Sequence, residues 1–149
     1  MQIRRATEND TDALFENRVR FLTEDLRQAF PDTLHKRLRE YIRLHTADGR
    51  LISAIAVENG CIAACAMLNL YESYPTAANP GGRIGHLFNV NTRPAFRRKG
   101  LAEAVVRRLL QEAKAAGAGI ITLDYTKQGK PLYEKLGFEH AEHDMKLIL

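Results

Sequence analysis

The sequence predicts a mixed α/β fold in which helices cover a mostly antiparallel sheet. Two short apolar segments joined by Asn59-Gly60 indicate an antiparallel hairpin, and a third strand-like segment follows after a loop. One long amphipathic helix between two strand-like segments indicates a strand–helix–strand crossover. Antiparallel pairing combined with one such crossover is typical of layered α/β domains. The expected element order is β-α-α-β-β-β-α-β-α-β, in a single domain over residues 1–149.

The first third of the chain is expected to form a strand and two helices. Residues 3–6 form a short apolar-alternating segment, and the polar run 7–10 supplies side-chain oxygens that can cap a helix start. Apolar side chains at helical spacing mark one helix, and a second set after Pro31 marks another that ends near Gly49. The two apolar stripes are Phe15, Val19, Leu22 and Leu26, and then Leu34, Leu38, Tyr41 and Ile42.

The middle of the chain is expected to supply three strands. Residues 51–57 and 61–70 are short and apolar, and the Asn-Gly pair at 59–60 favours a two-residue turn because both residues tolerate positive φ. Residues 74–82 contain two prolines and two glycines, which predicts an irregular loop. Residues 83–92 alternate again. We expect Ile84, His86, Phe88 and Val90 on one side of that strand and Leu87, Asn89 and Asn91 on the other.

A long helix, a strand, a short helix and a closing strand complete the predicted order. The long helix begins at Leu101 and ends before Gly117, because glycine takes the left-handed cap conformation without steric penalty. Residues 120–125 are expected to be a strand, residues 131–136 a short helix, and residues 145–149 the closing strand. The apolar face of the long helix comprises Leu101, Val105, Leu109 and Ala113, beside Ala102, Val106 and Leu110.

Composition and charge exclude several classes of protein. Apolar residues make up 45% and charged residues 27% of the chain, which is ordinary globular usage and not that of a disordered or fibrous protein. No apolar run approaches the ~18 residues that a membrane helix requires, and the first residues lack the apolar stretch of a secretory signal. The chain has 22 basic and 18 acidic residues, which is a mild basic excess. No aromatic residues alternate with the basic residues to form a surface on which nucleic-acid bases could stack. We therefore expect a cytoplasmic protein without membrane or nucleic-acid partners.

The segment with the clearest chemistry is the basic loop that leads into the long helix. Arg97, Arg98 and Lys99 precede Gly100, which lets the backbone approach a ligand closely. Unpaired amides at a helix start carry about half a positive charge, so the loop suits a pyrophosphate or a similar anion. By itself, a glycine with basic neighbours more often marks an ordinary solvated loop than a binding site. Two nucleotide-binding patterns, GxxxxGK[ST] and GxGxxG, are absent.

Two motifs, in this order, resemble those of the GNAT acetyltransferase superfamily. Residues 90–102 (VNTRPAFRRKGLA) are similar to its acyl-coenzyme A motif, Arg/Gln-x-x-Gly-x-Gly/Ala at the start of a long helix. Residues 129–138 (GKPLYEKLGF) are similar to its closing motif, in which Leu-Tyr-x-x-Leu-Gly-Phe ends a short helix. One helix and one strand separate the two motifs, as in the family. The resemblance implies one acetyltransferase domain with a mixed sheet and helices on both faces.

The resemblance implies acetyl-coenzyme A as co-substrate, with no metal. The backbone of Val90 and Thr92 would hold the pantetheine arm, and an amide near Val90 would polarise the thioester carbonyl. The amides of residues 98–102 and the Arg97 side chain would cradle the pyrophosphate. The implied cofactor-binding residues are Val90, Thr92, Arg97, Arg98, Lys99, Gly100, Leu101, Ala102 and Thr126.

Tyr133 is the catalytic residue that the resemblance implies. It would stand near the cofactor sulfur and protonate the departing thiolate, although an aromatic residue on a short helix is more often a packing residue. Thr126 stands where many relatives carry an asparagine, and its hydroxyl can still donate a hydrogen bond. The general base is left open between His86, Asp124, Glu72 and an ordered water.

Other polar features are expected to be structural. Cys61 and Cys65 are expected to pack on one strand face, and two cysteines are too few for a disulfide framework. His140 and His143 lack the further ligands that zinc requires. The arginines of the first two helices are expected on solvated outer faces or, as the alternative, around the rim of an acceptor pocket. They are Arg18, Arg20, Arg27, Arg37, Arg39 and Arg43.

These features predict an N-acetyltransferase that moves an acetyl group from acetyl-coenzyme A to a primary amine by direct transfer in a ternary complex. Neither cysteine lies in a nucleophilic constellation, so no covalent intermediate is expected. The cofactor is expected between strands 83–92 and 120–126, and the amine from the opposite side. The acceptor is a small-molecule or peptide amine of open identity, and a homodimer is one option for the assembly. The alternative function is a non-catalytic acyl-coenzyme A sensor.

Overall fold

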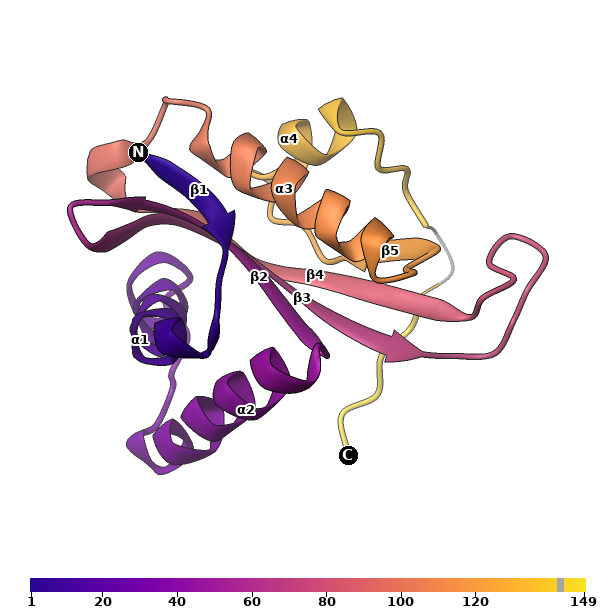
Figure 1. Cartoon of the computed structure of the whole chain (residues 1–149), viewed down its shortest axis with the longest axis horizontal. Helices are drawn as coiled ribbons and strands as arrows, with labels where there is room; N and C mark the ends of the chain where they lie inside the picture. The colour runs from indigo at the N-terminus through magenta and orange to yellow at the C-terminus, as the bar shows by residue number, and fades with distance from the viewer. Residues whose placement is uncertain (142–143) are drawn as a thin grey trace.

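Five strands lie side by side in the order in which they occur along the chain (Figure 1). The structure is a computed structural model that describes residues 1–141 and 144–149. The first four strands pair antiparallel in succession, and the fifth joins the fourth in parallel, which confirms the predicted mostly antiparallel sheet. The strands are β1 (Gln2–Arg5), β2 (Leu51–Glu58), β3 (Cys61–Glu72), β4 (Arg83–Thr92) and β5 (Ile120–Leu123).

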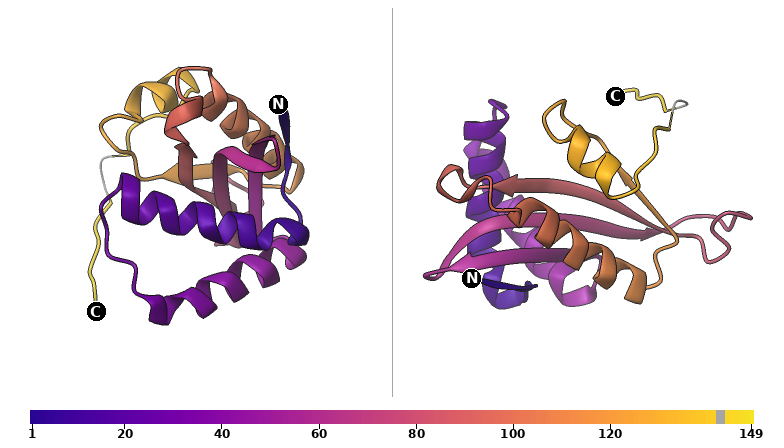
Figure 2. Two further views of the ribbon diagram at one scale, coloured as in Figure 1. Left: turned by 90° about the vertical axis from the view of Figure 1, so that its left-hand side faces the viewer. Right: turned by 90° about the horizontal axis from the view of Figure 1, so that it is seen from above.

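Helices cover both faces of this sheet, as predicted (Figures 1 and 2). α1 (Thr11–Arg20) and α2 (His35–Asp48) lie on one face, and α3 (Leu101–Ala115) and α4 (Lys130–Lys135) lie on the other. In the described part of the chain, no helix combines the length and the apolar character that crossing a membrane demands. The core under α1 and α2 includes Leu14, Phe15, Ile42, Ile55 and Met67, and the core under α3 includes Ile52, Leu68, Leu87, Val105 and Leu109.

The N-terminal helices begin and end at the polar and glycine residues that predict their ends. The Thr7 amide donates to the Asp10 carboxylate at 2.8 Å and closes a capping turn ahead of α1. Past Arg20 the chain continues as a wider π-helical segment, Phe21–Asp25, which buries Leu22. α2 ends at Gly49, whose φ of 82° is left-handed.

The β2–β3 hairpin turns at the predicted Asn-Gly pair. Asn59 and Gly60 have φ values of 51° and 74°, as a type I′ turn requires. Cys65 is buried in the core, as expected, but Cys61 is exposed, which corrects its expected packing role. The reason is that Cys61 pairs with Glu58 beside the turn, at the end of the hairpin.

β4 carries a bulge that changes which side chains share a face. Its register with β3 shifts between Phe88 and Asn91, and Asn89 takes a left-handed φ of 54°. As a result Leu87 and Val90 both pack in the core under α3, whereas Phe88 packs in the core under α1 and α2. The predicted strict alternation along this strand is therefore wrong, because an inserted residue interrupts a period of two.

β4 and β5 pair over a short stretch and then separate. The paired residues run from Ile84 with Ile120 to Leu87 with Leu123. β4 continues to Thr92, whereas β5 ends two residues before the predicted end of its strand. The separation exposes one edge of β4 beside the start of α3.

The predicted closing strand at residues 145–149 is not formed. Residues 144–149 have no strand assignment, and the side chains of Met145, Leu147 and Ile148 are 99%, 83% and 82% exposed. Apolar residues stabilise a strand when they are buried against neighbouring strands or helices, and this segment buries none of its apolar side chains. The rest of the predicted element order is confirmed.

Candidate functional site

A cavity of about 880 Å³ opens where β4 and β5 separate. Its walls come from α1 and the π-helical segment after it, from β4, from the start of α3, and from residues 124–133. Lys99 is not part of the wall, and its ammonium lies 5.5 Å from the Phe96 ring centroid. The other predicted site residues line the cavity: Val90, Thr92, Arg97, Arg98, Gly100, Leu101, Ala102, Thr126 and Tyr133.

The start of α3 has the geometry of an anion-binding site. Arg98 and Gly100 both have left-handed φ values, 62° and 73°, and such alternation can turn successive amides toward one side. The first amides of α3 have no acceptor within the helix. Apart from its two chain neighbours, no residue has an atom within 4 Å of the position that a Cβ on Gly100 would take, so the space beside this glycine is open. An anion here would meet backbone donors at the positive end of the helix dipole.

Arg97 connects the end of β4 with the segment that follows α1. Its Nε donates to the Thr92 carbonyl at 3.1 Å, and its Nη2 lies 3.6 Å from Asp25 Oδ1. The Arg97 side chain is half exposed and also lines the cavity. Two of its guanidinium nitrogens therefore have partners in the protein, and the half-exposed group still faces the cavity.

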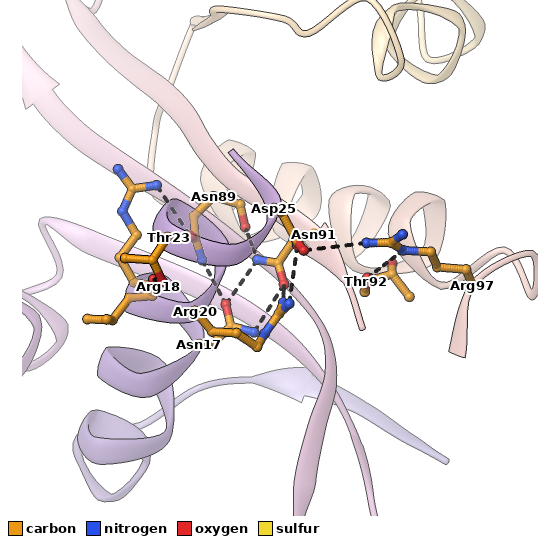
Figure 3. A network of polar contacts seen from close by, with 10 residues as sticks. Asn17, Arg18, Arg20, Thr23, Asp25, Asn89, Asn91, Thr92 and Arg97 are labelled. Atoms are coloured by element: carbon orange, nitrogen blue, oxygen red, sulfur yellow. Dashed lines mark hydrogen bonds and ion pairs between the residues drawn. The ribbon is translucent and has the colours of Figure 1, made fainter. Parts of the chain in front are cut away.

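Three buried asparagines join α1 to the bulge of β4 (Figure 3). Asn17 is fully buried, and Asn89 and Asn91 are 4% and 5% exposed. The Nδ2 groups of Asn89 and Asn91 each donate to Asn17 Oδ1 at 3.0 Å, and Asn17 Nδ2 donates to Asn91 Oδ1 at 3.1 Å. Because buried polar groups require partners, this network holds the backbone beside Val90 in one conformation.

Two arginines of α1 extend the network toward the cavity. Arg20 donates to Asn91 Oδ1 at 2.8 Å and to Asp25 Oδ2 at 3.2 Å. Arg18 donates to Asn89 Oδ1 at 3.3 Å and lines the cavity. The expected solvated position is therefore wrong for Arg18 and Arg20, because their guanidinium groups find buried amide acceptors. The exposed arginines of this set are Arg27, Arg37, Arg39 and Arg43.

Tyr133 reaches the cavity from α4 and also packs against the core under α3. Burial raises the pKa of its hydroxyl above the ordinary value, so the phenol keeps its proton at neutral pH. Its ring packs edge-on against Phe138, and a Cβ on Gly129 would lie only 3.1 Å from the ring. Thr126 Oγ1 accepts from the Gly129 amide at 3.1 Å, which leaves the Thr126 hydroxyl proton available to donate.

The fold separates the three side-chain candidates for the general base. His86 and Asp124 line the cavity, and His86 Nδ1 lies 2.9 Å from Thr122 Oγ1. Glu72 is not among the lining residues and forms an ion pair with Arg83 at 3.3 Å. Two of the three candidates therefore remain at the site.

The sequence does not predict the asparagine network, although it contains one indication of it. Asn89 and Asn91 lie on a strand with apolar neighbours, and a buried amide requires a partner. That partner, Asn17, lies 72 residues away from Asn89 along the chain, beyond the reach of any local pattern.

Within residues 1–141 and 144–149, no three His, Cys, Asp or Glu side chains cluster as metal ligands. His140 instead packs edge-on against Tyr125, with 5.5 Å between ring centroids. His143, the other histidine considered for zinc, lies outside the described residues.

The chain shares its fold with an acetyltransferase of known structure. The chain belongs to the acetyltransferase (GNAT) family, whose sequence profile matches residues 15–138.

Individual proteins of known structure or curated function are similar as well. The crystal structure of a predicted acetyltransferase from Clostridium acetobutylicum, solved with acetyl-CoA, has a TM-score of 0.90 and 32% identity over 99% of this chain and 95% of that one. Glucosamine 6-phosphate N-acetyltransferase of Trypanosoma brucei brucei is 37% identical over 70 residues, which cover 46% of this chain and 48% of that protein. Probable glucosamine 6-phosphate N-acetyltransferase 2 of Oryza sativa subsp. japonica is 43% identical over 58 residues, which cover 39% and 35%. The match thus spans half or less of each of these curated relatives.

Proposed function

We propose that this chain is an N-acetyltransferase that transfers an acetyl group from acetyl-coenzyme A to a primary amine. The observation that carries the proposal is one continuous cavity lined both by the loop before α3 and by Tyr133. The similar Clostridium acetobutylicum structure, solved with acetyl-CoA, supports the choice of co-substrate.

The co-substrate diphosphate would bind at the start of α3. The left-handed residues Arg98 and Gly100 and the amides up to Ala102 supply backbone donors, and the Arg97 guanidinium adds a cation. The pantetheine arm would lie along the unpaired edge of β4, at Val90 and Thr92, and Thr126 would donate from the opposite wall.

The transfer would proceed in one complex without an acyl-enzyme. The amine nitrogen attacks the thioester carbonyl carbon, an amide near Val90 stabilises the negative charge on the carbonyl oxygen, and the carbon–sulfur bond breaks. The Tyr133 hydroxyl donates its proton to the departing thiolate, and a base at His86 or Asp124, or a water, takes the amine proton. A cysteine nucleophile is disfavoured, because burial raises the pKa of Cys65 to about 12 and Cys61 is not a cavity residue.

The acceptor is proposed to be a small amine. The curated relatives are named for glucosamine 6-phosphate, which makes this amino sugar the first acceptor to assay. It would enter over the wall formed by α1 and the segment after it.

The test is thiol release from acetyl-coenzyme A with a panel of amines, for the wild type, Tyr133→Phe and Tyr71→Phe. Tyr71 is an exposed tyrosine outside the cavity lining and serves as the matched control. We expect amine-stimulated release whose kcat falls about 100-fold in Tyr133→Phe and stays at the wild-type value in Tyr71→Phe. Tight acetyl-coenzyme A binding without amine-stimulated release would refute catalysis and favour the acyl-coenzyme A sensor.

A further inference from the structure

Arg18 is a cation in the cavity wall that has no acidic partner among the described residues. Its one side-chain hydrogen bond goes to Asn89 Oδ1, at a long 3.3 Å. A guanidinium group has five N–H donors, so most of its donor capacity is unused by the protein. No carboxylate of the described chain forms an ion pair with it, in contrast to Arg20 and Arg97.

The surroundings of Arg18 favour an anion beside it. The guanidinium carbon lies 5.3 Å from the centroid of the Phe88 ring, which covers one side of the cation. Burial lowers the pKa of the group, which indicates that its charge has lost part of its hydration. A partly desolvated cation without a counter-ion is unfavourable, and an anion entering the cavity would compensate it.

The acids of the cavity wall do not supply that anion. Asp25 is already shared between Arg20, at 3.2 Å, and Arg97, at 3.6 Å. Asp124 lines the cavity but forms no ion pair with Arg18. The carboxylates of the site therefore leave the Arg18 charge uncompensated.

Arg18 is also separate from the cations at the start of α3. Arg97 and Arg98 belong to the loop proposed to hold the diphosphate, whereas Arg18 comes from α1 and contacts the β4 bulge. The cavity thus has two cationic regions, and the co-substrate diphosphate accounts for one of them.

We propose that the acceptor amine carries a carboxylate or phosphate group and that Arg18 binds this group. The inference rests on the proposed acetyl transfer and specifies its substrate class. Arg18 contacts residue 89, the neighbour of the proposed thioester-binding Val90, so the anion lies close to the reacting carbonyl.

The test compares acetylation of matched amine pairs by the wild type, Arg18→Gln, Arg18→Lys and Arg43→Gln. The pairs are glucosamine 6-phosphate with glucosamine for the phosphate, and glutamate with its diamide for the carboxylate. We expect wild-type kcat/KM to be at least about 10-fold higher for the charged member of one pair, since charge-assisted bidentate hydrogen bonds are strong. Arg18→Gln removes this preference by raising KM for the charged amine and changes kcat/KM for the neutral amine less than about 3-fold. Arg18→Lys, which keeps the charge but loses the planar fork, gives an intermediate value.

The controls separate binding of the anion from folding and from the proposed function. Arg43 is an exposed arginine of α2, so Arg43→Gln retains wild-type preference, and acetyl-coenzyme A affinity is unchanged in every variant. The proposed anion site is overturned if the wild type has equal kcat/KM for charged and neutral amines, or if Arg18→Gln lowers kcat/KM equally for both. Either result leaves the proposed acetyl transfer unaffected. If no amine is acetylated, binding of the two charged amines is measured by calorimetry in the presence of coenzyme A. Binding that Arg18→Gln abolishes supports the anion site, and absence of binding overturns it.

Discussion

Asn17→Ala tests whether the buried asparagines hold α1 against the bulge of β4. The substitution removes three hydrogen bonds that connect Asn17 with Asn89 and Asn91. Asn91 keeps partners, because its Nδ2 still donates to the Asn89 carbonyl and its Oδ1 still accepts from Arg20. Asn89 Nδ2 keeps only Cys65 Sγ, at 3.6 Å. One buried amide is therefore left without an adequate acceptor.

The expected loss follows from these contacts. A buried polar group left without a partner costs about 1–3 kcal/mol, and the other lost hydrogen bonds add about 1 kcal/mol each. We therefore expect Asn17→Ala to lower the free energy of unfolding by about 3–5 kcal/mol. Asn89→Gly removes the side-chain amide that Asn17→Ala leaves without an acceptor, and glycine tolerates the φ of 54°. In a protein that already carries Asn89→Gly, Asn17→Ala should therefore lower the free energy of unfolding by about 1–3 kcal/mol less than it does in the wild type.

Urea unfolding followed by circular dichroism measures both quantities. Asn9→Ala, at an exposed asparagine, is the matched control and should change the free energy of unfolding by less than about 0.5 kcal/mol. If Asn17→Ala is as stable as this control, or if its effect is the same with and without the Asn89 side chain, the asparagines do not hold α1 against the bulge of β4.

Two further predictions concern the loop before α3 and the cysteines. Gly100→Glu and its control Gly49→Glu both place a side chain at a left-handed φ where, apart from the chain neighbours, no residue has an atom within 4 Å of the Cβ. Only Gly100→Glu should weaken acetyl-coenzyme A binding in calorimetry, by at least about 10-fold, because it puts a negative charge in the proposed diphosphate site. An unchanged affinity would show that the diphosphate binds elsewhere. Burial raises the pKa of Cys65 to about 12, whereas Cys61 is exposed. A thiol reagent applied between pH 7 and 9 should therefore modify Cys61 rapidly and Cys65 only after denaturation. Rapid modification of both thiols in the folded protein would contradict the buried position of Cys65.

The features that the sequence predicts correctly depend on a few neighbouring residues. The Asn59-Gly60 turn and the end of α2 at Gly49 follow from the φ angles that these residues tolerate. The long helix α3 follows from its apolar spacing, and the loop before it from a short motif that the structure places at the cavity. Such determinants act within one or two turns of chain, so they can be recognised without knowing the fold.

Only the tertiary structure decides which distant groups meet. The bulge at Asn89, the position of Asn17 beneath it and the burial of Arg18 depend on how α1 packs against β4, about seventy residues away along the chain. The apolar residues 145–149 show the converse, because an apolar segment forms a strand only where a partner strand and a buried face exist. Local sequence limits the conformations of each segment, and the choice among them is made by burial and hydrogen bonding between segments.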